Sequence, residues 1–131
     1  MVYGSLAGVK EWLQIASTNT QYDTELTNIQ EYVNQRIRTI LRKYVSDPSS
    51  LSSSLTAQLA DIENEWTAGV FKMRRSGAIE AKDQPLINDA MKRLDEFIES
   101  NFKKEFWKLS LKAMKGLFRE EKGKVVKVGK G

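Results

Sequence analysis

Apolar residues recur along the chain at helical spacing, in stretches that polar residues separate. Ser5, a residue type that favours helix N-termini, precedes a short stretch whose apolar positions share one helical face. The polar, turn-rich residues 16–20 separate it from a much longer stretch, which opens near Thr20 and Asp23. The pattern therefore predicts a short helix and then a long one. Their apolar positions are Leu6, Val9, Trp12 and Leu13 in the first, and Tyr22, Leu26, Ile29, Val33, Ile37, Ile40, Leu41 and Tyr44 in the second.

The opposite face of the long helix is polar, as expected of an amphipathic helix that packs on a core with one side. Its last turn is basic, which suits the negative end of the helix dipole. The residues of this polar face are Glu31, Asn34, Gln35, Arg38, Arg42 and Lys43.

Two further helices are predicted after a loop that contains Pro48 and several serines. The third helix contains Gly69, where glycine costs about 1 kcal/mol relative to alanine and therefore indicates close packing against a neighbour. Gly77 is predicted to be the C-terminal cap of this helix. Asp83 as N-cap and Pro85 in the first turn open the fourth. The apolar positions are Leu55, Leu59, Ile62, Trp66, Val70 and Met73 in the third helix, and Leu86, Ala90, Leu94, Phe97, Ile98 and Phe102 in the fourth.

The pattern changes beyond residue 105. Residues 106–118 form an amphipathic helical pattern with two apolar faces, which either continues the fourth helix or docks separately. Residues 124–128 are β-prone and lie between glycines, and they have no partner strand in the chain. A short terminal strand of this kind is either disordered or is added to the sheet edge of another protein.

Length and composition favour one domain. A chain of 131 residues can bury a core without metals or disulfides. We therefore predict an all-α fold, a small bundle of four or five helices in the order short, long, medium and medium, with an extended basic C-terminal tail. The helical domain is assigned to residues 1–118 and the tail to residues 119–131. No apolar run approaches the ~20 residues of a membrane span, and the first residues do not resemble a signal peptide, so we expect an intracellular protein without a membrane partner.

Candidate catalytic chemistry is sparse. The chain has no cysteine and no histidine, which excludes thiolate nucleophiles, imidazole bases and the zinc sites built from these residues. Paired carboxylates such as Asp61 and Glu65, or Glu120 and Glu121, are expected on a solvated helix face. No phosphate-binding glycine loop is present. We expect no enzyme, no cofactor and no metal site.

Charge is unevenly distributed along the chain. Residues 101–131 contain ten Lys or Arg and three acids, so this part carries +7 while the whole chain carries +4. A basic segment either stays solvated or meets a negative partner. Aromatic residues are interleaved with lysines in 102–119. One hypothesis for the function is therefore a small helical nucleic-acid-binding protein that uses its basic C-terminal third.

The opening residues Tyr3-Gly4-Ser5-Leu6-Ala7-Gly8-Val9-Lys10-Glu11-Trp12-Leu13-Gln14-Ile15 follow the pattern Tyr-x-Ser/Thr-x-x-x-Val-Lys-x-Trp/Tyr-Leu-x-Ile. After a short polar gap come an acid, Asp23, and the long helix. This arrangement resembles the head–tail connector (adaptor, or head-completion) family of tailed bacteriophages, over residues 3–105. The sequence departs from that family in having only Asp23 and Glu25 before the long helix, and in the lysine-rich extension 106–131.

The resemblance implies a structural virion protein, which assembles in the host cytoplasm and resides at the head–tail junction. Such adaptors form a ring, commonly of twelve copies, beneath the portal protein, extend the DNA channel and join the capsid to a stopper or tail-completion protein. DNA would pass without sequence-specific contacts. The C-terminal segment of such proteins reaches into the portal, so the portal-binding candidates are Lys124, Val125, Val126, Lys127 and Val128. A ring needs two different contact faces on each subunit, and the candidates for one of them are Trp107, Leu111, Met114 and Phe118.

Overall fold

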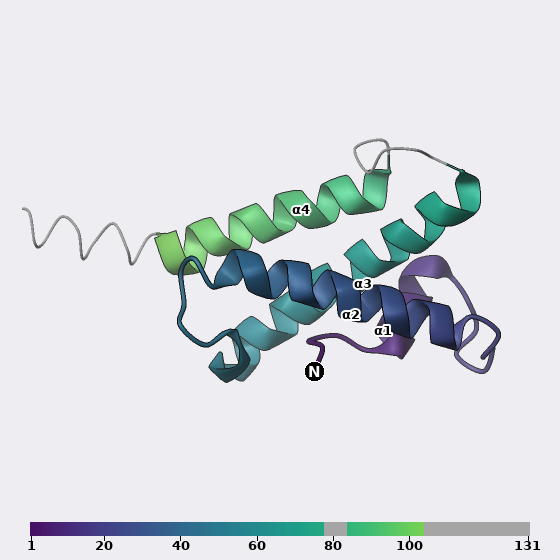
Figure 1. Ribbon diagram of the computed structural model, residues 1–131, viewed down its shortest axis with the longest axis horizontal. Helices are drawn as coiled ribbons and strands as arrows, with labels where there is room; N and C mark the ends of the chain where they lie inside the picture. Colours follow the sequence, from purple (N-terminus) through teal and green to yellow (C-terminus); the bar gives the residue numbers. More distant parts are fainter. Residues whose placement is uncertain (78–83, 104–131) are drawn as a thin grey trace, which may run out of the picture.

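The computed structural model describes residues 1–77 and 84–103. This part of the chain is all-α: four α-helices pack together and no strand occurs among the described residues (Figure 1). The helices are α1 (Leu6–Leu13), α2 (Asp23–Leu41), α3 (Ser53–Ser76) and α4 (Pro85–Ile98), with a short 3-10 turn η1 (Pro48–Ser50) and a π turn η3 (Glu99–Lys103). The predicted all-α class and four-helix bundle are therefore confirmed. The predicted lengths differ at the third helix, since α3, expected to be of medium length, has 24 residues and is longer than α2 with 19.

Helix α3 is the centre of the bundle and packs against α1, α2 and α4. In Figure 1, α2 and α4 both run along the long axis of the molecule, and α3 passes behind and between them. Because neighbours cover it on several sides, α3 is buried continuously from Ile62 to Phe71, polar residues included. A helix in that position cannot have a simple polar face.

The core contains most of the predicted apolar positions of α2, α3 and α4, together with Ala68, Phe71 and Ile87, which were not predicted. Of the predicted α1 positions only Val9 is fully buried, and Leu6, Trp12 and Leu13 are partly buried. The α2 stripe is the most complete, and every member from Leu26 to Leu41 except half-buried Ile40 is at most 1% exposed. Tyr44 does not belong to it, because α2 ends at Leu41 and the Tyr44 side chain is exposed. The buried apolar residues are Val9, Leu26, Ile29, Val33, Ile37, Leu41, Leu59, Ile62, Trp66, Ala68, Val70, Phe71, Ile87, Ala90, Leu94, Phe97 and Ile98.

Local capping signals define most helix ends. The Ser5 hydroxyl accepts a hydrogen bond from the Gly8 amide at 3.1 Å, as its position predicts. Gly77 has a φ of 74° and closes α3 in the left-handed conformation that favours glycine. The N-cap of α4 is Gln84 and not Asp83, since the Gln84 side chain accepts from the Leu86 amide at 2.6 Å. Pro85 takes the first helical position, where its missing amide costs nothing.

Gly69 lies at a close approach between α3 and α4. A Cβ atom on Gly69 would lie 2.7 Å from Cγ1 of Ile87 and 2.9 Å from its backbone nitrogen. The glycine therefore permits the first turn of α4 to lie directly on α3, which confirms the packing reason predicted for it.

Candidate functional site

The N-terminal segment is held against the centre of the bundle by backbone hydrogen bonds to buried side chains of α3. The Gly4 amide donates to Glu63 Oε1 at 2.8 Å, and the Ser5 amide donates to Asn64 Oδ1 at 3.0 Å. The Tyr3 hydroxyl donates to the carbonyl of Pro48 at 2.8 Å. These bonds join residues separated by 45 to 59 positions in sequence.

Glu63 is the centre of a buried polar cluster, and its residue is fully shielded from solvent. Besides the Gly4 amide, its carboxylate accepts a hydrogen bond from Asn34 Nδ2 at 2.7 Å. Asn34 in turn accepts from Arg38 Nε at 2.8 Å. Burial raises the pKa of Glu63, and the hydrogen bonds from Gly4 and Asn34 oppose that rise. The cluster thus satisfies its own polar groups, as a buried network must.

This cluster corrects the prediction for α2. Asn34 and Arg38, assigned to the polar face, are only 2% and 8% exposed. The reason is that Asn34 meets Glu63 of α3, while the N-terminal segment and η1 cover Arg38. The guanidinium of Arg38 is further fixed by Ser49 Oγ at 2.6 Å and the Met1 carbonyl at 2.7 Å.

A second buried charge joins α1 to the start of α2. The ammonium of Lys10, whose side chain is 5% exposed, lies 2.8 Å from Asp23 Oδ1. It also donates to the carbonyl of Ser17 at 3.3 Å. The lysine of the opening motif and the acid before the long helix are therefore partners in space. Sequence reasoning noted both residues but not that they form a pair.

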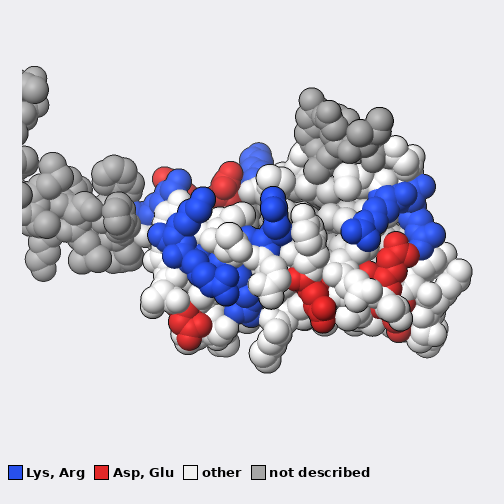
Figure 2. Space-filling model, viewed as in Figure 1, with Lys and Arg blue, Asp and Glu red and all other residues white. Residues whose placement is uncertain are grey.

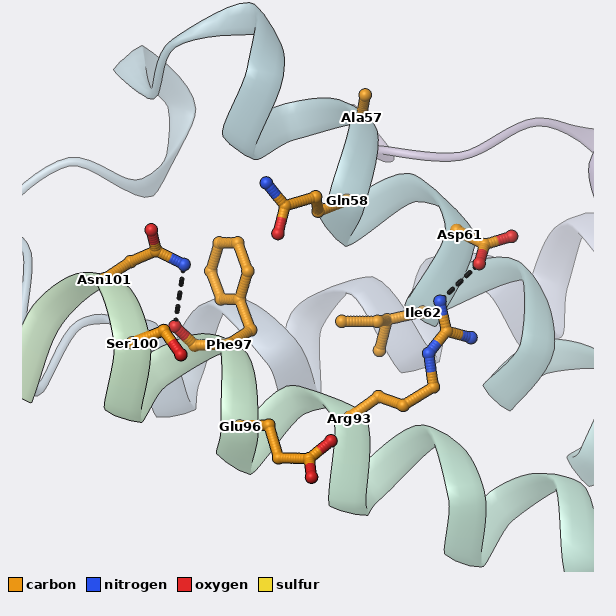
Figure 3. A pocket seen from close by; sticks show the side chains of 9 residues that line it. All are labelled: Ala57, Gln58, Asp61, Ile62, Arg93, Glu96, Phe97, Ser100 and Asn101. Atoms are coloured by element: carbon orange, nitrogen blue, oxygen red, sulfur yellow. Dashed lines mark hydrogen bonds and ion pairs between the residues drawn. The ribbon is translucent and has the colours of Figure 1, made fainter.

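Between α3 and α4, Arg93 binds two carboxylates, and Figure 3 draws its contact with Asp61. Arg93 pairs with Asp61, which is exposed, and with Glu65 Oε1 at 2.7 Å. A surface pocket of about 510 Å³ lies beside this cluster, and Gln58, Phe97 and Asn101 also line it. Arg93 thus closes one end of the pocket with its charge already neutralised.

Glu65 differs from the prediction of a solvated carboxylate, because it is only 1% exposed. Burial raises the pKa of Glu65 to about 7, helped by a hydrogen bond with Asp89 and opposed by Arg93. Such a value suits general acid–base catalysis. However, the described lining of the pocket includes Asp61 and Arg93 but not Glu65. The geometry therefore favours a structural role, in which buried Glu65 accepts a hydrogen bond from Arg93 and links α3 to α4.

An apolar groove lies between α2 and α4, and residues of α3 also line it. It encloses about 310 Å³. Tyr32 of α2 and Met91 of α4 form its two sides, and these side chains are 54% and 47% exposed. Its other lining residues are Arg36, Trp66, Val70, Met73, Arg74 and Ile87. Spacing alone cannot find this groove, because it arises where three helices meet.

Basic and acidic side chains are mixed over the face on which α2 lies (Figure 2). At the left of this view Lys and Arg side chains adjoin one another in a diagonal patch, and elsewhere on the face basic and acidic side chains alternate. Among residues 1–77 and 84–103, no group of three or more acidic side chains is arranged to hold a metal ion. Within the same residues, no helix is both long enough and apolar enough to cross a membrane.

The sequence-predicted site residues lie outside the described part of the chain. This applies to the subunit-interface candidates Trp107, Leu111, Met114 and Phe118, and to the portal-binding candidates Lys124, Val125, Val126, Lys127 and Val128. Comparison with protein-family models, with curated proteins and with solved structures found no match to this chain.

Proposed function

We propose that this chain is a head–tail connector of a tailed virus. In this proposal it forms a ring, commonly of twelve copies, beneath the portal protein, extends the DNA channel, and presents a platform to the stopper or tail-completion protein. It would act through protein–protein contacts at the head–tail junction of the virion, after synthesis in the host cytoplasm.

The observation that supports the proposal is the pairing of Lys10 with Asp23. The resemblance to connectors rests on an opening helical motif and on an acid before the long helix, and these two parts contact each other at 2.8 Å. Other motif residues also lie in the contact between α1 and α3: Val9 is fully buried, and Ser5 is both the N-cap and a partner of Asn64. Ser5, Val9 and Lys10 of the motif thus each have a structural role in the fold, and such a motif is a stronger basis for a resemblance than helix order alone.

The experiment is capture of a portal protein from cells that carry the corresponding virus or provirus. The bait is the full chain, joined to a tag through a flexible linker at Met1, whose side chain is fully exposed. Nuclease is present throughout, and mass spectrometry identifies the retained proteins. The comparison bait ends at Lys122 and so lacks residues 124–128.

Retention of a portal protein by the full chain, and its loss on truncation, is the expected result. A matched pair sharpens it: Val126→Pro removes a backbone donor that strand addition would need, whereas Val126→Thr preserves it. Loss in the proline variant with retention in the threonine variant indicates strand addition. If instead only nucleic acid is retained, and nuclease and added salt abolish it, the connector proposal is wrong and the nucleic-acid reading takes its place.

A further inference from the structure

The groove between α2 and α4 is an apolar surface without a partner in the described part of the chain. Trp66 and Val70 form its floor and are 7% and 6% exposed, whereas Tyr32 and Met91 at its sides are about half exposed. Large apolar side chains that line a concave surface are typical of sites for a partner helix. The groove is therefore a candidate site for a partner helix.

The charges of the groove indicate what that occupant carries. Arg36 and Arg74 both line it, one from α2 and one from α3. Arg36 lies over the Tyr32 ring at 5.9 Å from its centroid. Within residues 1–77 and 84–103, neither guanidinium takes part in an ion pair. A helix with an apolar face and a carboxylate on the same face would complement both the floor and these two charges.

The C-terminal part of the sequence has that pattern. Met114, Leu117, Phe118 and Glu121 follow the spacing i, i+3, i+4 and i+7, which places them on one face of a helix. The basic residues of the same stretch recur at the complementary spacing, on the opposite face: Lys108, Lys112, Lys115 and Arg119. Such a segment can bury apolar side chains and Glu121 while its lysines stay in water.

The position of this segment in the chain favours a second copy as the acceptor. The described bundle ends at Lys103, about 18 Å beyond Met91 along α4 at ~1.5 Å per residue. To reach the groove of its own chain, the segment would have to reverse direction within the ten residues between Lys103 and Met114. No glycine or proline occurs between Pro85 and Gly116, and these are the residues that most favour a tight reversal.

We propose that the groove between α2 and α4 binds residues 106–121 of a second copy of this chain. Glu121 then lies near Arg36 or Arg74, and the side chains of Met114, Leu117 and Phe118 cover Trp66. The two contact surfaces differ, so the contact is heterologous and repeats from copy to copy until a ring closes or a filament grows. This inference deepens the proposed ring and takes its biological meaning from it.

Cysteine cross-linking tests the contact, because the chain has no native cysteine. One full-length variant carries Met91→Cys, and a second, distinguished by a size tag, carries Leu117→Cys. The two are mixed over a range of concentrations and oxidised. We expect a disulfide-linked heterodimer whose yield rises with concentration. The matched control replaces Met91→Cys by Glu11→Cys, an exposed position on α1, and is expected to give at least about tenfold less heterodimer.

Charge reversal tests the orientation. Arg36→Glu combined with Arg74→Glu, or Glu121→Arg alone, is expected to lower the heterodimer yield, and mixing the two reversed chains should restore much of it. Circular dichroism and urea unfolding check that each variant remains folded. A variant that loses its fold is replaced by Arg36→Gln with Arg74→Gln, which removes both charges.

Two results would overturn the inference. One is a chain carrying both cysteines that forms only an intrachain disulfide, since the segment then folds back on its own groove. The other is a heterodimer yield no greater than that of the control at every concentration. Portal capture is a separate readout. Capture without the cross-link supports the connector proposal and contradicts the groove contact. The cross-link without capture supports the groove contact and contradicts the connector proposal.

Discussion

Asn34 of α2 donates a hydrogen bond to the buried carboxylate of Glu63 on α3, with 2.7 Å between Nδ2 and Oε2. The other oxygen of that carboxylate accepts from the Gly4 amide. One side chain therefore joins three segments: the N-terminal stretch, α2 and α3. The amide groups of Gly4 and Asn34 therefore depend on Glu63 as their hydrogen-bond acceptor.

Replacing Glu63 with leucine should destabilise the fold by about 2–4 kcal/mol, because the Gly4 amide and the Asn34 amide group lose a buried acceptor. Glu63→Gln retains the shape and one acceptor oxygen, and should cost less. Urea unfolding of the three proteins measures both differences. Equal costs for the two variants would show that the carboxylate's hydrogen bonds are not what matters at this position.

Glu65 predicts a pH dependence of stability. Its pKa is raised by burial to about 7 in the folded chain, against an ordinary value of 4.5. Between those values the folded state holds more protons than the unfolded state, so stability falls as pH rises through this window. A shift of this size corresponds to a loss of the order of 1–3 kcal/mol.

Glu65→Gln removes this titration. The free energy of unfolding of the native chain, minus that of the variant, should therefore decrease between pH 4.5 and pH 7 in a series of urea titrations. Taking the difference cancels contributions from other carboxylates, including Glu63. A difference that increases over this range would contradict the sign of the shift.

Gly69→Ala should destabilise the bundle by about 1–3 kcal/mol, although alanine favours helix, because the added methyl group overlaps Ile87. Gly77→Ala is the contrasting case. No atom lies within 4 Å of the added methyl there, so its cost is confined to the left-handed backbone, about 1 kcal/mol. Thermal unfolding compares them. A Gly69→Ala variant as stable as the native chain would contradict the close contact between α3 and α4.

Gly8→Ala should weaken the packing of α1, because a methyl group at Gly8 would overlap the Asn64 side chain. Asn64→Ala removes that obstacle at the expense of its bonds to Ser5 and Gln30. The cost of Gly8→Ala should therefore be smaller in the Asn64→Ala background. The unfolding free energies of the native chain, the two single variants and the double variant give the coupling energy between the two positions. If the costs of the two single substitutions simply add, Gly8 and Asn64 are not in contact.

The helices were predictable because their apolar stripes and caps are local signals. Ser5 and Gly77 act within a few residues, and the stripe from Leu26 to Leu41 needs only its own spacing. The packing at Gly69 was also predictable, since glycine inside a helix is costly without a close neighbour.

The buried polar clusters were not predictable from such signals. Asn34 and Glu63 are 29 positions apart, and each reads as a solvated residue on its own helix. The same holds for Glu65 and Arg93, 28 positions apart. The side chains of Asn34, Glu63 and Glu65 are buried because each finds a hydrogen-bond partner on another helix. The spacing of apolar residues along one helix contains no information about a partner on another. The groove between α2 and α4 was not predictable either, because it is formed by residues of three different helices.

The hydrogen bonds from Gly4 and Ser5 to α3 also set an order of events during synthesis. Gly4 and Ser5 leave the ribosome before their partners Glu63 and Asn64, which follow 59 positions later. Until then α1 can pair with α2 through Lys10 and Asp23, but Gly4, Ser5 and Asn34 lack their partners on α3. Loop closure over that distance must come before those bonds form. The beginning of this chain is therefore among the last parts to acquire its final structure.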